Sequence, residues 1–211
     1  MNIKRFEFNM FPVNCYVLDD NGEAVIIDAG CYYPEEQQTL KKYITDHNLT
    51  IKYLLDTHLH LDHVFGNPYL LREFGVRAHA SEKDEFWLPR TGEMARMFGI
   101  PLNEEPVSLG GYINDGDEFR FGTACLEAIA TPGHSPGGMV FYSKGSKCLF
   151  CGDSLFQGSI GRTDLPGGDF DDLRESIRSR LFILPEDTVV YPGHGDATTI
   201  GREKMNNPYF R

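Results

Sequence analysis

Residues 52–66, KYLLDTHLHLDHVFG, constrain the fold of this chain more than any other segment. An apolar run that is typical of a short buried strand leads into a cluster of histidines and aspartates, namely Asp56, His58, His60, Asp62 and His63. Imidazoles and carboxylates packed this closely repel and desolvate one another unless a cation takes up their lone pairs. We therefore expect a divalent metal site where this strand ends, in preference to an incidental histidine-rich surface loop.

The spacing within the cluster indicates how it could bind metal. His58 and His60 are two positions apart, so on an extended loop both imidazoles can point to one side and bind one ion. Asp62 and His63 follow, where Gly66 and Pro68 indicate that the chain tightens into a turn. One loop could therefore contribute ligands to two ions.

Composition limits the remaining possibilities. Hydrophobic residues make up 41% of the chain and charged residues 24%, which is typical of a globular protein, and we expect a single domain over residues 1–211. The formal net charge of −11 argues against nucleic acid as a partner, because binding phosphates requires a surplus of Lys and Arg. Neither a leader nor an apolar run of the roughly 18 residues that a membrane span needs is recognisable, so we expect no membrane partner and a cytoplasmic location. The sequence does not indicate an oligomeric state.

The five cysteines also favour a reducing compartment, because their number is odd and their spacing is not that of a disulfide framework. Cys148 and Cys151 lie three positions apart on an expected strand. Side chains at that spacing point to opposite faces, which disfavours a shared metal or disulfide role.

Segments rich in β-structure occur in both halves of the chain, and each is followed by helix. The unbroken apolar run at 24–27 predicts a strand covered on both faces, entered through a hairpin turn at 20–23. Helices are expected over 34–48, from about 69 to Gly75, over 171–184 and, irregularly, over 81–98. The aromatic and methionine side chains of 81–98 could roof a pocket, although core packing is the simpler interpretation. The pattern predicts two sheets packed together with helices outside.

Four of the expected strands end in potential metal ligands. Loops at strand ends are where a rigid sheet presents functional groups, so we expect these side chains to converge. Asp28, at the end of the 24–27 strand, is either a residue that supports the site or a turn residue. The candidate ligands are His58, His60, Asp62 and His63 after one strand, and His134, Asp153 and His194 after the other three.

The motif THLHLDH, with the later His134, Asp153 and His194, resembles the metallo-β-lactamase-fold hydrolases. Two further segments, GDSLFQGSIGRTDLPGGD at 152–169 and PGHGDATTIGREKMNNPYF at 192–210, are most similar to the glyoxalase II-like hydroxyacylglutathione hydrolases. The resemblance implies an α/β (α+β) fold arranged as a four-layer αββα sandwich.

The resemblance also implies two divalent metal ions per chain. Zinc is the first expectation, with iron or manganese as alternatives, since imidazole and carboxylate ligands suit these ions and suit calcium poorly. A metal-bound water would then attack a thioester carbonyl such as that of S-lactoylglutathione. The implied ligands are His58, His60 and His134 for one ion, Asp62, His63 and His194 for the other, and Asp153 as the bridge.

Two further roles are open. Asp62 could also steer protons during the reaction. Arg162 either orients a carboxylate-bearing substrate or braces the metal loop through Asp164.

Three functions are consistent with the sequence. The leading one is a dinuclear metal-dependent hydrolase, a thioesterase of the glyoxalase II type acting on a small-molecule acyl-thioester. The second is a persulfide dioxygenase with one iron, because these enzymes share the fold and a GRTD-like loop. The third is a non-catalytic metal-binding module, although structural zinc sites usually close with four strong ligands.

Departures from relatives limit the assignment. Familiar class B β-lactamases carry cysteine in the second metal site, whereas this chain has Asp153 after Gly152, which disfavours antibiotic hydrolysis. Full-length glyoxalase II enzymes continue into a helical extension that contacts glutathione, and we expect no such C-terminal helical substrate domain here. Arg202 and Lys204 either replace those contacts or are solvated tail charges.

Overall fold

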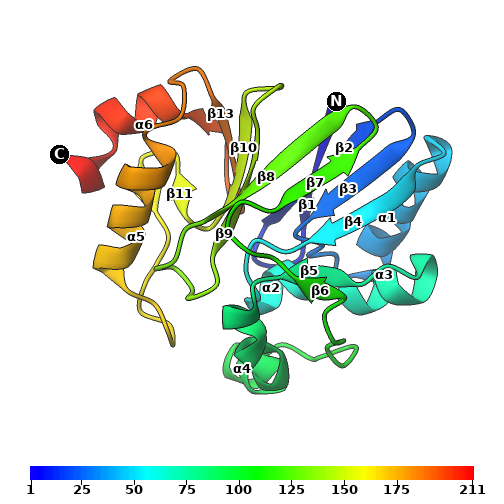
Figure 1. The fold of residues 1–211 in the computed structure, drawn as a ribbon. Coiled ribbons are helices and arrows are strands. Elements are labelled where there is room, and N and C mark those ends of the chain that lie inside the picture. The colour runs from blue at the N-terminus through cyan, green and yellow to red at the C-terminus, as the bar shows by residue number, and fades with distance from the viewer.

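The computed structural model describes residues 1–211 and shows two sheets packed face to face with helices on both outer sides (Figure 1). The first sheet has the strand order β1-β2-β3-β4-β5-β6, and the second has the order β14-β13-β10-β9-β8-β7. Helices α1 and α3 cover the first sheet, and α5 and α6 cover the second. This arrangement confirms the expected four-layer αββα sandwich.

The strands are short and each sheet mixes parallel with antiparallel pairs. The first sheet contains β1 (Asn2–Phe8), β2 (Val13–Asp20), β3 (Glu23–Ile27), β4 (Thr50–Leu55), β5 (Ala78–Ala80) and β6 (Gly111–Tyr112). The second contains β7 (Glu118–Phe121), β8 (Ala124–Ala130), β9 (Met139–Ser143), β10 (Cys148–Gly152), β13 (Val189–Pro192) and β14 (Thr198–Thr199). A separate hairpin consists of β11 (Leu155–Phe156) and β12 (Ser159–Ile160).

The helical elements connect and cover these strands. The α-helices are α1 (Pro34–Asp46), α2 (Leu61–Val64), α3 (Asn67–Phe74), α4 (Thr91–Met97), α5 (Phe170–Ser176) and α6 (Ile200–Asn206). Two 3₁₀ segments, η1 (Glu82–Arg90) and η3 (Pro208–Phe210), and one π-helical segment, η2 (Ile177–Leu181), complete the chain. None of the helices combines the length with the apolar character that crossing a membrane requires.

Three hydrophobic clusters fill the three interfaces between the four layers. In β3, Ile26 packs with Leu40 of α1, whereas Val25 and Ile27 face the second sheet. Because successive side chains of a strand point to opposite faces, a strand between a helix layer and another sheet must be apolar on both. The prediction that residues 24–27 are covered on both sides is therefore confirmed.

Local signals in the sequence also correspond to the structure. The hairpin between β2 and β3 turns through Asn21 and Gly22, which both have positive φ. Cys148 lies in the cluster between the sheets and Cys151 in the cluster beneath α5 and α6, so the two thiols face opposite ways, as expected.

Three expectations differ in detail. The helix expected over 34–48 ends at Asp46, and the one expected over 171–184 becomes a π-helix after Ser176. The irregular helix expected over 81–98 divides into η1 and α4 close to Pro89, whose ring lacks an N–H. The C-terminal residues, for which no element was predicted, form β14, α6 and η3.

Candidate metal centre

The segment after β4 brings four of the expected ligands together. Residues 58–60 follow the strand in extended form, and the chain then enters the short helix α2, which carries Asp62 and His63. His58 and His60 lie with their ring centroids 4.6 Å apart, and His58 and His63 with theirs 4.1 Å apart. The change from extended chain to helix therefore directs these side chains into one small volume.

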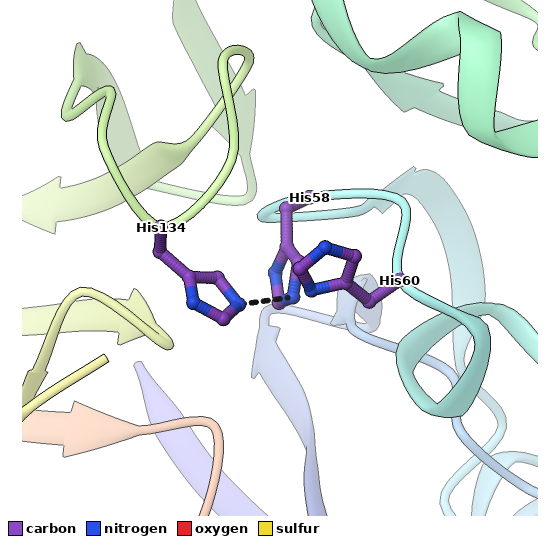
Figure 2. A group of neighbouring side chains, drawn as sticks. All are labelled: His58, His60 and His134. Carbon is purple, nitrogen blue, oxygen red and sulfur yellow. Dashed lines mark hydrogen bonds between the residues drawn. The ribbon is translucent and has the colours of Figure 1, made fainter. Parts of the chain in front are cut away.

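His134 completes a group of three imidazoles (Figure 2). It comes from the loop between β8 and β9 in the second sheet, and its Nε2 lies 3.2 Å from the Nε2 of His58. His58, His60 and His134 each offer a ring nitrogen within 4.8 Å of the others, and all three are buried. A group of this kind can hold one borderline-soft divalent ion.

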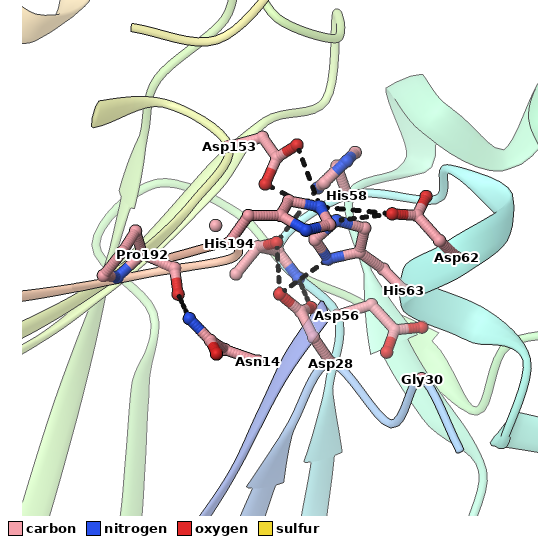
Figure 3. A network of polar contacts seen from close by, with 12 residues as sticks. Asn14, Asp28, Gly30, Asp56, His58, Asp62, His63, Asp153, Pro192 and His194 are labelled. Atoms are coloured by element: carbon pink, nitrogen blue, oxygen red, sulfur yellow. Dashed lines mark hydrogen bonds and ion pairs between the residues drawn. The ribbon is translucent and has the colours of Figure 1, made fainter. Parts of the chain in front are cut away.

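A second group lies beside the first (Figure 3). Asp62, His63 and His194 offer ligand atoms that also lie within 4.8 Å of one another, and Nε2 of His194 is 3.2 Å from Oδ2 of Asp62. His194 follows β13 in the second sheet, so both groups draw ligands from both sheets. The two groups match the two ligand sets expected from the sequence.

Asp153 lies between the groups. It follows β10, and its carboxylate is 3.5 Å from Nε2 of His63, 3.7 Å from that of His134 and 3.6 Å from that of His194. Glycine makes this approach possible, because a Cβ on Gly193 or on Gly161 would collide with Asp153. This is the position that a bridging carboxylate would occupy.

The residues present fit a pair of cations. Nε2 of His60, Nε2 of His63 and Oδ1 of Asp153 are buried and have no hydrogen-bond partner within the protein. Buried polar atoms are normally paired, and these three lie where metal ligands were expected. Two bound ions would supply the missing partners.

The electrostatics of the cluster support the same conclusion. Burial and neighbouring imidazoles lower the pKa of His58 well below its usual range and that of His60 to about 3. Burial acts against a charge on His63 as well, but the surrounding carboxylates outweigh it and raise its pKa. For Asp153, nearby imidazoles lower the pKa although burial opposes this. The lowered pKa values keep His58 and His60 neutral and Asp153 ionised, which are the forms that bind metal, whereas the raised pKa of His63 means that a bound ion would displace its proton.

Asp28 supports ligands of both groups. Its Oδ2 lies 3.0 Å from Nδ1 of His63, which leaves Nε2 of that ring free to face the site. The same carboxylate accepts hydrogen bonds from the backbone N–H and the hydroxyl of Thr57, whose Oγ1 is 3.0 Å from Nδ1 of His58. Asp28 also has a φ of 54°, so it both forms the turn after β3 and supports the site.

Backbone carbonyls orient His134 and His194. Nδ1 of His134 donates to the carbonyl of Arg162 at 2.7 Å, and Nδ1 of His194 donates to that of Pro12 at 3.2 Å. The guanidinium of Arg162 donates from Nε and from one Nη to the two carboxylate oxygens of Asp164, both at 2.7 Å. Arg162 thus makes the bracing contact considered for it, and it also lines the cleft above the ligands.

Asp84 is a functional candidate that the sequence did not reveal. It is buried in η1, where its carboxylate accepts hydrogen bonds from Leu59 N at 3.3 Å, Ser135 Oγ at 2.7 Å and Gly137 N at 2.6 Å. These contacts join the loop of His58 and His60 to the loop of His134. No signal in the charged run SEKDEF distinguishes Asp84 from its acidic neighbours, because its partners are mostly backbone groups.

His79 lies outside the metal centre. It lies in β5 on the first sheet, where its ring contacts Tyr53 edge-on at 6.3 Å, and it belongs to none of the ligand groups. The ligands border an open cleft of about 220 Å³, which is large enough for a small substrate.

Comparison with known proteins gives matches over the whole chain. Residues 9–194 match the family described as the metallo-beta-lactamase superfamily. Hydroxyacylglutathione hydrolase GloC of Haemophilus influenzae is 39% identical, with 100% of this chain and 98% of that protein covered. The similarity thus includes the hydroxyacylglutathione hydrolases that the sequence motifs resemble.

Two solved structures share the fold closely. One is the BLEG-1 B3 metallo-beta-lactamase, with 34% identity, a TM-score of 0.87 and 99% of both chains covered. The other is TTHA1623 in a di-iron-bound form, with 32% identity, a TM-score of 0.86, and 98% of this chain and 99% of that one covered.

Proposed function

This chain belongs to the metallo-beta-lactamase superfamily, and from that premise we propose that it is a dinuclear hydrolase that cleaves small acyl-thioesters in the manner of glyoxalase II. The observation that carries the proposal is the convergence of two ligand groups on Asp153 at the base of an open cleft. Structural metal sites are closed by their ligands, whereas hydrolytic sites leave room for water and substrate. We further propose that residues 1–211 act as one catalytic domain.

The bound ions would supply Lewis acidity and lower the pKa of water at the site. The surrounding protein residues hold the candidate ligands in place and orient them. Asp28 and the carbonyls of Arg162 and Pro12 fix which nitrogen of His63, His134 and His194 faces the cleft. Asp62 has one carboxylate oxygen 3.2 Å from His194, and at the cleft it is placed to receive or pass a proton.

Zinc is the ion that we propose first, with iron or manganese as alternatives, since the donors are imidazoles and carboxylates only. The similarity to a di-iron form of TTHA1623 makes iron a specific alternative. Metal analysis of protein purified without added metal decides between them.

The test is hydrolysis of S-D-lactoylglutathione and S-acetylglutathione by metal-loaded protein, followed as loss of the thioester, with and without chelator. We expect chelator-sensitive turnover with a kcat/KM on the order of 10⁴ M⁻¹s⁻¹ or above. Two equivalents of metal with no hydrolysis of either thioester would refute the proposal.

One comparison favours a second substrate class. BLEG-1, a B3 metallo-beta-lactamase, is 34% identical in sequence to this chain. Because of this similarity, the absence of a cysteine from the site does not by itself argue against antibiotic hydrolysis. A chromogenic cephalosporin in the same assay separates the classes. Cleavage of the β-lactam amide at a higher kcat/KM than either thioester would favour the lactamase assignment.

A further inference from the structure

A second cavity of about 100 Å³ adjoins the metal cleft, and its lining is mostly apolar. Met94, Phe98 and Leu165 line both cavities, so the two are adjacent. We call the second one the apolar groove. Its apolar lining consists of Trp87, Met94, Met97, Phe98, Leu165 and Pro166, with Arg90 and Glu93 as the charged residues.

The groove exposes large hydrophobic side chains that the fold does not cover. Met97 is 72% exposed and Phe98 is 45% exposed, although both lie at the end of a helix beside buried residues. The Phe98 ring also lies edge-on to Phe11 at 5.5 Å, and Phe11 lines the metal cleft. A contiguous apolar patch at the rim of a functional cleft is a mark of ligand binding.

The groove begins at the group of three histidines. The Trp87 ring is buried and lies edge-on to the ring of His60, with centroids 5.0 Å apart. A substrate whose carbonyl carbon reaches the ligand groups would thus have its next few atoms close to Trp87 and Met94. The groove therefore lies beside the group of three histidines, on the side of His60.

The region beside His194 has a different character. The ring of Phe156 lies 6.4 Å from that of His194, and the neighbouring Gln157, with its amide oxygen facing Arg202, accepts hydrogen bonds from that guanidinium at 2.9 and 2.6 Å. Lys204 is instead paired with Glu186 at 3.6 Å. The region beside His194 thus adds a polar pair, Gln157 and Arg202, next to one aromatic ring, whereas the groove is lined mainly by apolar side chains.

We propose that the apolar groove binds the acyl chain of the substrate, while the hydrophilic thiol carrier lies toward Gln157 and Arg202. The inference rests on the proposed hydrolase function and narrows its substrate class to thioesters of apolar carboxylic acids several carbons long. Such substrates are cleaved more efficiently than a short hydroxylated thioester such as the lactoyl one. The reason is that each added methylene group is transferred from water into the apolar groove, which stabilises the bound substrate and transition state.

The test measures chain-length dependence on the acyl side. For metal-loaded protein, kcat/KM is compared for the acetyl, butanoyl and hexanoyl thioesters of glutathione, and we expect a rise on the order of threefold per methylene. Met97→Ser and Phe98→Ser should each flatten this series. Met205→Ser is the matched control, since Met205 is 68% exposed but lies in α6, away from the groove, and it should leave the series unchanged.

Binding of acetate, butanoate and hexanoate to the metal-loaded protein, measured by calorimetry, separates this inference from the proposed function. These carboxylates contain only the acyl part, so tighter binding with length that is lost in Met97→Ser supports the groove even if no thioester is hydrolysed. Hydrolysis without any dependence on acyl length would refute the groove. The groove assignment would also be refuted if kcat/KM depended on alkyl length only when the alkyl chain is in the thiol part of the substrate.

Discussion

At the scale of single residues, Asp153 has the contacts that test the metal centre most directly, since it lies close to imidazoles from three separate segments. We expect Asp153→Ala to lower the metal content from two ions per chain toward one or none. We also expect it to lower kcat/KM by more than about 100-fold, because even residues that only orient a ligand cost 10- to 100-fold when removed. Elemental analysis and steady-state kinetics provide the measurements.

Asp115→Ala is the matched control for that variant. Asp115 is also a carboxylate in a loop, but its partners are Arg180 at 2.7 Å and Ala130 N at 2.8 Å, and it contacts none of the ligands. It should retain metal and activity. If Asp153→Ala kept two ions and full turnover, the bridging assignment would be wrong.

Asp84 is expected to act on the metal without touching it. Asp84→Ala removes the acceptor for Ser135 and for the N–H groups of Leu59 and Gly137, so the loops that carry His58, His60 and His134 lose their common anchor. We expect metal affinity to fall by about 10- to 100-fold, measured by competition with a chromophoric chelator. Asp84→Asn, which keeps one acceptor oxygen, should recover part of that loss.

A control in the same element separates positioning from stability. Ser81 caps η1, and Ser81→Ala should lower the free energy of unfolding by about 1 kcal/mol with metal affinity unchanged. Equal affinities in Asp84→Ala and Ser81→Ala would contradict a positioning role for Asp84.

Candidate metal ligands such as Asp153 can be predicted from the sequence, whereas residues that only position the ligands, such as Asp84, cannot. His134, Asp153 and His194 could be singled out because each follows an apolar run and a small or turn-forming residue. Asp84 could not, since its partners become neighbours only after η1 packs against both loops. A residue that acts through backbone groups leaves no pattern of its own in a single sequence.

At the scale of elements, α6 shows what periodicity fails to predict. Helical periodicity needs about 11 residues or more to be recognised, whereas α6 is a short helix that buries Ile200, Gly201 and the charged Glu203. The strands β6, β11, β12 and β14 contain two residues each and carry no periodic signal. The unbroken apolar run of β3, by contrast, could be predicted correctly because it is buried on both faces.

The buried Glu203 fastens α6 to its surroundings. Its carboxylate accepts hydrogen bonds from Gly158 N, Thr198 Oγ1 and Asn207 Nδ2. We expect Glu203→Ala to lower the free energy of unfolding by about 2–3 kcal/mol, because it leaves buried donors without partners. Urea denaturation measures the change.

The neighbouring Lys204 offers the comparison. Its side chain is 48% exposed and forms a surface ion pair with Glu186. Because such exposed ion pairs contribute little to stability, Lys204→Ala should leave the free energy of unfolding nearly unchanged. Similar losses in both variants would mean that α6 is held by its apolar contacts and not by Glu203.

At the scale of the whole molecule, the metal centre joins the two sheets. The first sheet supplies the ligands of residues 58–63, and the second supplies His134, Asp153 and His194. Direct hydrogen bonds join the sheets there as well, among them Asn14 N to the carbonyl of Gly193 at 2.6 Å, Met139 N to the carbonyl of Thr57 at 2.8 Å and the Tyr16 hydroxyl to the carbonyl of Pro192 at 2.7 Å. The ions should therefore contribute to the stability of the whole fold.

Removal of metal tests this contribution. If free metal exceeds its dissociation constant about 1,000-fold, binding stabilises the folded state by about 4 kcal/mol. For a chain of this size, chelation should then lower Tm on the order of 10 °C, measured by calorimetry. Asp153→Ala should respond less to chelator than the unsubstituted protein, and an equal Tm with and without metal would show that the sheets do not depend on the ions.

The overall fold was predictable because its ligands, turns and buried strands are each marked locally, and together they resemble one family. For the aromatic and methionine side chains of 81–98, the sequence leaves open whether they roof a pocket or pack in the core. Trp87 is buried and Met97 is exposed, and only the packing of η1 and α4 decides which side chain fills the core and which lines a cavity.

The distribution of ligands along the chain also has a consequence for biosynthesis. His58 to His63 leave the ribosome early, His134 and Asp153 much later, and His194 after nearly all of the second sheet has been made. The group of three histidines can be complete once His134 has been made, whereas the second group also needs His194. Binding of an ion to the second group would therefore be a late step in biosynthesis, which becomes possible only after nearly the whole chain has been made.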